Sequence, residues 1–400
     1  MYKLFNQCNF YIFLWCLYYL QGTLYASGSI ISQAILAILL VMSICNAYIV
    51  NRHYKLPIFF KGLNVLIAMF TIYGIAIIVS GEKLMTNNYT ILANHEYLKA
   101  IYISLLPIYS AYLYTIKGQL TKKSISIWIF FWILVATSQY YRNEREALEQ
   151  YISNRTEITN NSGYLFLALL PSLVVFNKKP IIQFPLLLYC ISFVVMGMKR
   201  GAIIIGLIIF CYFIYRTYKT SSRKNRKYII TFSFLVIFLA TSFIMKMMAE
   251  SDYFNQRIEQ TLEGNSSGRD DIYGGLINHF LDETNALNFF FGNGAQATLK
   301  VHGAFAHNDW LEILINQGII GVLIFIYFFI CFAKTWLKSR YNHSVFSGIG
   351  MILAIIFLRT LFSMSYSDLD LYLTISLGFY LALSFGKYDK YNKDIFIINQ

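Results

Sequence analysis

The sequence predicts an all-α integral membrane protein of about twelve transmembrane helices, with one long extracytoplasmic loop between the ninth and the tenth. Three observations predict this fold class. Hydrophobic residues make up 57% of the 400-residue chain and charged residues only 13%, whereas soluble proteins average about 25% charged residues. The mean hydropathy is +0.52. The apolar residues also gather in long runs, so most of the chain is expected to lie in lipid.

A helix that crosses a bilayer needs about 20 mainly apolar residues. The first such segment resembles a signal peptide, but residues 24–27 (LYAS) make a poor cleavage site, so we expect it to be retained as a span. The seventh and eighth nearly touch, which predicts a tight turn at residues 199–201. The expected spans are residues 5–20, 28–50, 57–80, 97–116, 124–140, 162–177, 180–198, 201–216, 228–246, 311–333, 345–363 and 369–386.

The distribution of Lys and Arg predicts the orientation of these spans, because cytoplasmic loops carry an excess of basic residues. With the N-terminus inside, the inner side receives 21 of the 33 basic residues. It receives only two of the 20 acidic residues, Asp389 and Asp394. Both termini are therefore expected in the cytoplasm. The net charge of +13 reflects this asymmetry and attraction to anionic membrane lipids. It does not indicate a nucleic-acid partner, because no inner loop is large enough to form a binding face.

The chain is expected to divide into three parts. Residues 1–246 carry spans one to nine, residues 247–310 form the long extracytoplasmic loop, and residues 311–400 carry the last three spans and a cytoplasmic tail. A structureless connection as long as the loop would be unusual in a compact protein. We therefore expect a small helical unit that carries site residues.

Within this loop, residues 266–273 (SSGRDDIY) predict the start of a helix. A serine can cap the first turn, and Asp270 and Asp271 suit the positive end of the helix dipole. Arg269 is the exception, because a cation in the first turn opposes that dipole. An arginine beside free backbone N–H groups makes a natural phosphate site. The alternative is a surface ion pair of Arg269 with Asp270 or Glu263.

Residues 306–314 (AHNDWLEIL) predict the start of the tenth span, with Asp309 and Glu312 at capping-box spacing. His307 then lies just before a helix at the membrane surface. An imidazole there can act as a base or as a hydrogen-bond donor. The alternative is an interfacial histidine without a role. His302, His307 and Asp309 could also be imagined as metal ligands, but their spacing fits no common metal site.

One arginine, Arg359, lies inside an expected span, toward its outer end. A charged side chain in lipid costs at least ~2.5 kcal/mol, which makes Arg359 a functional candidate. It could instead snorkel to the interface, or pair structurally with Asp368 or Asp370. The sequence contains no Walker A, Gly-x-Ser-x-Gly, His-Glu-x-x-His or paired-cysteine motif.

Several short motifs in the second half of the chain resemble those of one family. Their order and spacing are similar to the superfamily of O-antigen ligases and Wzy-type O-antigen polymerases. The resemblance in layout covers nearly the whole chain, and the motifs lie between about Met198 and Phe325. They are Lys199–Ala202 (KRGA), Ser267–Arg269 (SGR), Phe291–Gly294 (FGNG), His307–Glu312 (HNDWLE) and Gly318–Gly321 (GIIG).

The resemblance implies a multi-pass, GT-C-like glycosyltransferase that uses neither a nucleotide-sugar donor nor a cofactor or essential metal. Its donor would be a glycan on undecaprenyl pyrophosphate, at the outer face of the bacterial inner membrane. By position, Arg200 and Arg269 would bind the pyrophosphate, and His307 would orient or deprotonate the acceptor hydroxyl. Asp368 would match, more loosely, an acidic residue near the site. Lys199 and Arg359 are further candidates because of their charge and their position near this site.

The acceptor separates the two activities of this superfamily. A polymerase transfers the glycan to another lipid-linked repeat unit, and a ligase transfers it to lipid A-core. Ligases tend to have a Ser/Thr-rich approach to the first arginine, whereas this chain has Gly197-Met198-Lys199-Arg200. This departure and the Phe291–Gly294 turn favour a polymerase, with the ligase as the alternative.

The rival class is a lipid-linked oligosaccharide flippase. Transporters tend to show inverted repeats and charges at the middle of the membrane, which are scarce here. The partners expected for a polymerase are the lipid-linked donor and acceptor, a flippase, a chain-length regulator and the membrane lipids.

Overall fold

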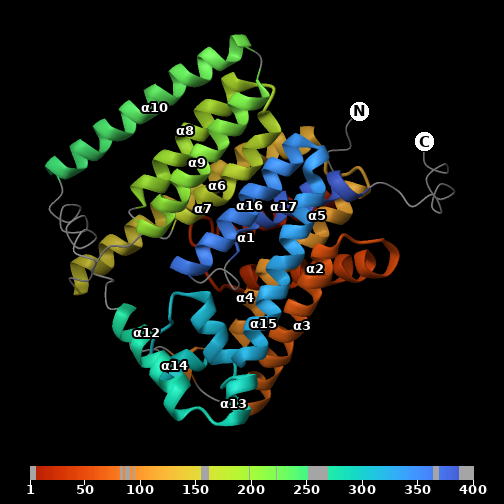
Figure 1. Ribbon diagram of the computed structural model, residues 1–400, viewed down its shortest axis with the longest axis vertical. Coiled ribbons are helices and arrows are strands. Elements are labelled where there is room, and N and C mark those ends of the chain that lie inside the picture. Colours follow the sequence, from red (N-terminus) through yellow and green to blue (C-terminus); the bar gives the residue numbers. More distant parts are fainter. Residues whose placement is uncertain are drawn as a thin grey trace.

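The computed structural model describes residues 6–81, 84–85, 91–92, 95–154, 162–197, 199–221, 223–250, 269–363 and 369–386. Nearly every regular element in these ranges is a helix (Figure 1). The exceptions are the short strands β1 (Leu84–Met85) and β2 (Ile91–Leu92), which pair antiparallel. The helices of the first half are α1 (Gln7–Tyr19), α2 (Ile30–His53), α3 (Ile58–Ser80), α4 (His95–Leu105), α5 (Pro107–Ile116), α6 (Lys122–Asn154), α7 (Gly163–Leu169), η1 (Leu170–Phe176) and α8 (Pro180–Met196). Those of the second half are α9 (Arg200–Thr220), α10 (Arg223–Glu250), α12 (Arg269–Asn278), η2 (His279–Glu283), α13 (Ala286–Phe291), α14 (Ala297–Val301), α15 (Asp309–Lys338), η3 (Ser339–Tyr341), α16 (His343–Phe362) and α17 (Leu371–Phe385).

Helices occupy every segment that was expected to cross the membrane. Within the described residues, six helical segments are long and apolar enough to do so alone: α2, α3, α6, α9, α15 with η3, and α16. The helices α8 and α17, and α7 together with η1, are apolar but shorter. The architecture is that of an all-α membrane protein, and the number of crossings remains a prediction.

Prolines explain two differences between the expected spans and the helices. The segment 97–116 is split into α4 and α5, and Pro107 is the first residue of α5. The segment 162–177 changes from the α-helix α7 to the 3-10 helix η1, which contains Pro171 near its start. Proline lacks a backbone N–H and its ring obstructs the preceding turn, so a helix tends to break or change its pitch there.

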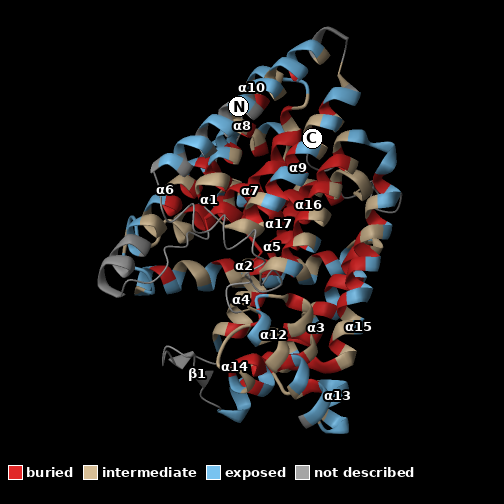
Figure 2. Cartoon of the chain, turned by 60° about the vertical axis from the view of Figure 1, so that its left-hand side comes forward, coloured by how far each residue is buried: buried red, intermediate tan, exposed pale blue. Residues whose placement is uncertain are grey.

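The core of the protein runs along α5 and α17. Every residue of α17 from Leu371 to Ala382 is buried, as is every residue of α5 from Pro107 to Tyr114. A Cβ atom at Gly378 of α17 would lie 2.3 Å from the backbone oxygen of Ile108, so the two helices meet backbone to backbone. Figure 2 shows the buried residues gathered around α5, α16 and α17, whereas most of the α10 side chains that the structure describes are exposed.

Contacts between helix ends show that α9 and α16 run in opposite directions. At one end, which we call the loop end, Gly201 of α9 lies against Phe362 of α16. At the other, which we call the basic end, Nε of Arg216 in α9 donates to Oγ of Ser347 in α16 at 2.9 Å. The helix α15 begins at the loop end, because its Trp310 donates from Nε1 to Oγ1 of Thr360 at 2.9 Å.

The helices α12, α13 and α14 form a small unit at the loop end (Figure 1). Its own hydrophobic core joins α12, η2 and α14 to the start of α15. The buried members of that core are Leu276, Phe280, Ala297, Ala306 and Ile315. The described part of the long loop is therefore folded onto the helix that follows it.

Candidate functional site

The basic turn between α8 and α9 lies at the loop end. Lys199 has an extended backbone and Arg200 is the first residue of α9, and both side chains are half-buried. A Cβ atom at Gly201 would lie 2.6 Å from Oη of Tyr164 and 2.8 Å from Cβ of Phe362. Only glycine fits there without a shift, so this close approach fixes the two cations between α7 and α16.

Arg269 is the first residue of α12, with Asp270 and Asp271 in the same turn. The helix thus starts where the sequence predicted, although the serines expected to cap it lie outside the described residues. Arg269 is half-buried. It lies at a helix N-terminus, where backbone N–H groups favour anions.

His307 lies in the short segment that leads into α15, with a backbone φ of +52°. This left-handed conformation is uncommon for a residue other than glycine and is often found at functional sites. Asn308 caps α15, because its Oδ1 accepts from the backbone N–H groups of Trp310 at 2.9 Å and Leu311 at 3.3 Å. The capping box expected from Asp309 and Glu312 was therefore wrong.

Glu312 accepts hydrogen bonds from other segments, a role that its sequence position did not predict. Its side chain is fully buried. One oxygen accepts from the backbone N–H of Ala306 at 2.6 Å, and the other accepts from Oγ1 of Thr298 at 2.8 Å and Nδ2 of Asn316 at 3.3 Å. Glu312 thereby ties α14 and the segment before His307 to α15. The only sequence signal was an acidic residue among apolar neighbours.

The charges of Lys199 and Arg269 reach His307. The pKa of His307 is lowered from its ordinary value, first by partial desolvation and then by the positive charges of Arg269 and Lys199. The imidazole is exposed at the surface, yet the surrounding chain removes enough water to disfavour its charged form. The structure therefore brings together three candidate residues from segments far apart in the sequence.

Arg359 is connected to this group through Tyr164. Its guanidinium carbon lies 4.7 Å from the centroid of the Tyr164 ring, and its Nη1 pairs with Oδ2 of Asp370 at 3.0 Å. Arg359 and Asp370 are both buried, so the arginine does not snorkel. Tyr164 also lies within electrostatic reach of Arg269. The pairing with Asp370 agrees with one of the alternatives above, and Asp368 lies outside the described residues.

The Phe291–Gly294 turn packs against the Gly318–Gly321 motif. Within α15, Gly318 has φ +67° and ψ −165°, so the helix is kinked there. The carbonyl groups of Ile315 and Asn316 accept from the backbone N–H groups of Asn293 at 2.9 Å and Gly294 at 3.0 Å.

Each of the two glycines at this contact lies where the other segment leaves no room. A Cβ atom at Gly292 would lie 2.4 Å from the backbone of Asn316, and one at Gly318 would lie 2.6 Å from the backbone nitrogen of Gly292. The two motifs are therefore a packing contact between the loop unit and α15.

The three residues considered as metal ligands are placed differently from one another. The ring of His302 lies against Gly275 of α12, at 2.8 Å from the position of a Cβ atom there. Asp309 is fully buried in the first turn of α15, whereas His307 is exposed. In the part of the chain that the structure describes, no group of three or more His, Cys, Asp or Glu side chains is arranged to hold a metal ion.

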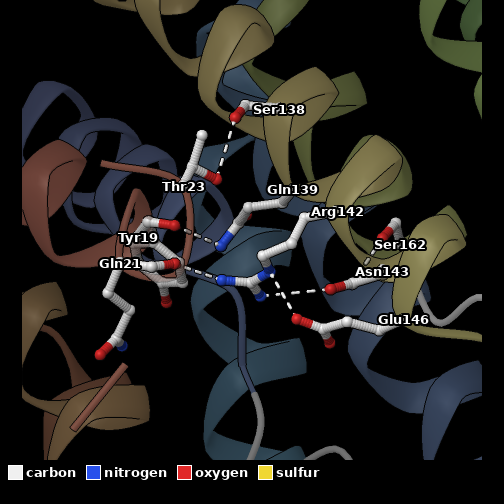
Figure 3. Close-up of polar contacts among 9 residues, drawn as sticks. All are labelled: Tyr19, Gln21, Thr23, Ser138, Gln139, Arg142, Asn143, Glu146 and Ser162. Carbon is white, nitrogen blue, oxygen red and sulfur yellow. Dashed lines mark hydrogen bonds and ion pairs between the residues drawn. The ribbon is translucent and has the colours of Figure 1, made fainter. Parts of the chain in front are cut away.

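A polar network at the loop end was not foreseen (Figure 3). Arg142 of α6 donates to the backbone oxygen of Gln21, and Nε2 of Gln139 donates to the backbone oxygen of Tyr19 at 3.0 Å. Nδ2 of Asn143 donates to Oγ of Ser162, directly before α7, at 2.8 Å. The network therefore holds α6 to the end of α1 and to the start of the helix that carries Tyr164.

One protein-family model matches the part of the chain that contains most of these candidate residues. Residues 185–326 match the family model described as O-antigen ligase. The match covers α9, α10, the loop unit and the first half of α15, and it includes Arg200, Arg269 and His307 but not Arg359. A search of curated proteins found no match to the chain.

Proposed function

We propose that the protein is a surface-polysaccharide polymerase, because residues 185–326 match the model of the glycosyltransferase-like O-antigen ligase family. It transfers a glycan from undecaprenyl pyrophosphate to a lipid-linked repeat unit, at the outer face of the bacterial inner membrane. It uses no cofactor and no metal. An O-antigen ligase that acts on lipid A-core is the second candidate.

The observation that carries the proposal is the convergence of cations on one imidazole. Lys199 and Arg269 both act on His307, although about 70 and 40 residues separate the three along the chain. Arg200 directly follows Lys199, and Arg359 lies beside the same turn through Tyr164. A pyrophosphate carries several negative charges, and arginine binds such oxygens with two parallel hydrogen bonds.

The reaction needs one bond broken and one formed. The acceptor hydroxyl attacks the anomeric carbon of the donor glycan while the bond from that carbon to the pyrophosphate oxygen breaks. Arg200 and Arg269 stabilise the negative charge that develops on the leaving undecaprenyl pyrophosphate. The proton of the acceptor hydroxyl passes to His307, so that charge and atoms balance.

The environment of His307 suits a base. Since its pKa is lowered, the imidazole is neutral at pH 7 and can accept a proton. General-base catalysis of this kind contributes about 10²–10⁴-fold in rate. Arg269, which binds the donor, thus adds to the effect of desolvation in keeping the histidine in its neutral, reactive form.

The choice of polymerase over ligase rests on the basic turn. This chain presents Lys199 beside Arg200, where ligases tend to have Ser and Thr. A second cation suits a site that receives pyrophosphate on both the donor and the acceptor lipid, as polymerisation requires.

The test is single-repeat transfer by the purified full-length protein. Lipid-linked repeat units alone should yield the dimeric repeat, with chelator present. His307→Ala should lose transfer while donor binding persists, and Trp336→Phe at the basic end serves as the control. Transfer only to lipid A-core would show the ligase instead. Loss of transfer on adding chelator would refute the arginine mechanism.

A further inference from the structure

A polar cavity lies at the basic end, away from the proposed site. It measures about 30 Å³ and lies between η1, α8, α9 and α16. Arg216, which lines it, follows Arg200 by 16 residues on α9, so the two sites are about 24 Å apart along the helix. The other polar side chains that line the cavity include Asn177, Gln183, Thr217, Ser344 and Ser347.

Gln183, which lines the cavity, carries one acceptor atom that no described residue satisfies. Its side chain is only 1% exposed, and its Nε2 donates to the backbone oxygen of Leu173 at 3.0 Å. Its Oε1 is buried and accepts no hydrogen bond from any residue that the structure describes. A buried acceptor without a hydrogen bond is unfavourable. A guest hydroxyl that donates to this atom would satisfy it.

Arg216 is held in one orientation beside the cavity. Its Nε donates to Oγ of Ser347 at 2.9 Å, and its Nη2 donates to the backbone oxygen of His343 at 3.4 Å. Its guanidinium carbon lies 5.3 Å from the centroid of the Phe346 ring. Oγ of Ser344 accepts from Nδ2 of Asn177 at 2.6 Å, which leaves the serine hydroxyl hydrogen to be donated. Together these groups favour an anion.

The charge around the cavity points the same way. Neither residues 171–249 nor residues 313–367 contain an Asp or Glu, and these two stretches supply the whole lining. Exposed lysines lie next to lining residues, with Lys178 and Lys179 after Asn177 and Lys219 after Thr217. An anionic guest would therefore meet no opposing carboxylate from the lining segments.

We propose that this cavity binds a phosphate ester that also carries a hydroxyl, as in a phosphoglycerol headgroup. The phosphate lies at the mouth, on Arg216 and Ser344, and the hydroxyl enters the cavity and donates to Oε1 of Gln183. The cavity is large enough for a small hydroxyl-bearing group, and the phosphate remains at its mouth. Basic pockets between transmembrane helices at the cytoplasmic side commonly bind anionic headgroups. Phosphatidylglycerol supplies this chemistry in the membrane, and glycerol phosphate supplies it in solution.

The experiment measures lipid binding to the full-length protein in phosphatidylcholine nanodiscs. Phosphatidylglycerol should bind more tightly than phosphatidylmethanol, an anionic phosphodiester that lacks the hydroxyl. Arg216→Gln should weaken phosphatidylglycerol roughly ten- to a hundredfold, because hydrogen bonds to charged groups are among the strongest. Gln183→Leu should remove the preference over phosphatidylmethanol.

Arg340→Gln is the matched control. Arg340 is exposed at the same end, next to the Tyr341 ring, and does not line the cavity. Its replacement should change binding by no more than about twofold. Arg216→Lys keeps the charge without the two-pronged guanidinium, so it should bind phosphatidylglycerol at an intermediate level. It replaces Arg216→Gln in the test if that variant does not fold.

The outcomes separate the source of the guest from the existence of the site. Competition by soluble glycerol phosphate would identify a soluble guest, and its absence would identify the lipid. Equal binding of phosphatidylglycerol and phosphatidylcholine would overturn the proposal. So would equal effects of Arg216→Gln and Arg340→Gln, or a wild-type protein that does not distinguish phosphatidylglycerol from phosphatidylmethanol.

Discussion

The buried carboxylate of Glu312 offers the sharpest test of how His307 is positioned. Glu312→Ala leaves three buried donors without their acceptor, on Thr298, Ala306 and Asn316. At about 1–3 kcal/mol for each unsatisfied group, and with some relaxation, we expect a loss of roughly 3–5 kcal/mol in the free energy of unfolding. Glu312→Gln keeps the shape but places an amide N–H₂ against a donor, so it should cost about 1–2 kcal/mol.

The same substitutions should lower the transfer rate by more than the loss of folded protein explains. The Ala306 N–H bond fixes the backbone directly before His307, and a misplacement of 1 Å in a site can cost about a hundredfold in rate. We therefore expect folded Glu312→Gln protein to bind the lipid-linked donor normally and to turn over up to about a hundredfold more slowly.

The assay combines denaturant unfolding in detergent with single-repeat transfer. Glu146→Gln is the control. The Glu146 side chain is exposed, and its Oε1 lies 3.6 Å from Nε of Arg142 in a surface ion pair. Wild-type stability and turnover in Glu312→Ala would refute the reasoning, since three buried donors would then have found other partners at no cost.

Three further predictions follow from the site. Arg200→Lys and Arg269→Lys should each lose most transfer with folding preserved, because a lysine lacks the bidentate fork; normal chain length in both would reduce them to surface charges. Arg269→Gln removes a charge that lowers the pKa of His307, so the loss of activity at acid pH should begin at a higher pH than in wild type; an unchanged pH profile of single-turnover transfer would show that the charges are not coupled. In a chain without its six native cysteines, Leu287→Cys, exposed on α13, should react with a membrane-impermeant reagent in intact cells, and labelling only after the inner membrane is opened would contradict the outward site.

The sequence anticipated the features that depend on local pattern. Long apolar runs predicted the positions of the helices, and the Asp270–Asp271 pair marked the start of α12. The basic pair Lys199–Arg200 drew attention by its place between two spans, whereas the roles of Arg200, Arg269 and His307 come from the family resemblance and stay predictions. These signals are local because helix periodicity, capping and the cost of charge in lipid act within a few residues.

The features that the sequence did not reveal depend on contacts between distant segments. Glu312 looked like a capping residue because its spacing from Asp309 is right, but its carboxylate is used by α14 and Ala306. Arg142 belongs to no motif in the sequence, yet it holds α6 to the connection after α1. The spacing of apolar residues along the sequence does not predict such partners, since they come together only when the helices pack.

The contact between Gly292 and Gly318 has a consequence for how related chains can diverge. Each glycine is obstructed by the backbone of the other segment, and no trimming of a side chain elsewhere makes room for a Cβ atom. A substitution at one position therefore has no compensating partner, and the kinked helix and the turn can change only by being rebuilt together. We expect the two glycines to be inherited as a pair, present together in descendants that keep this junction and absent together in those that have replaced it.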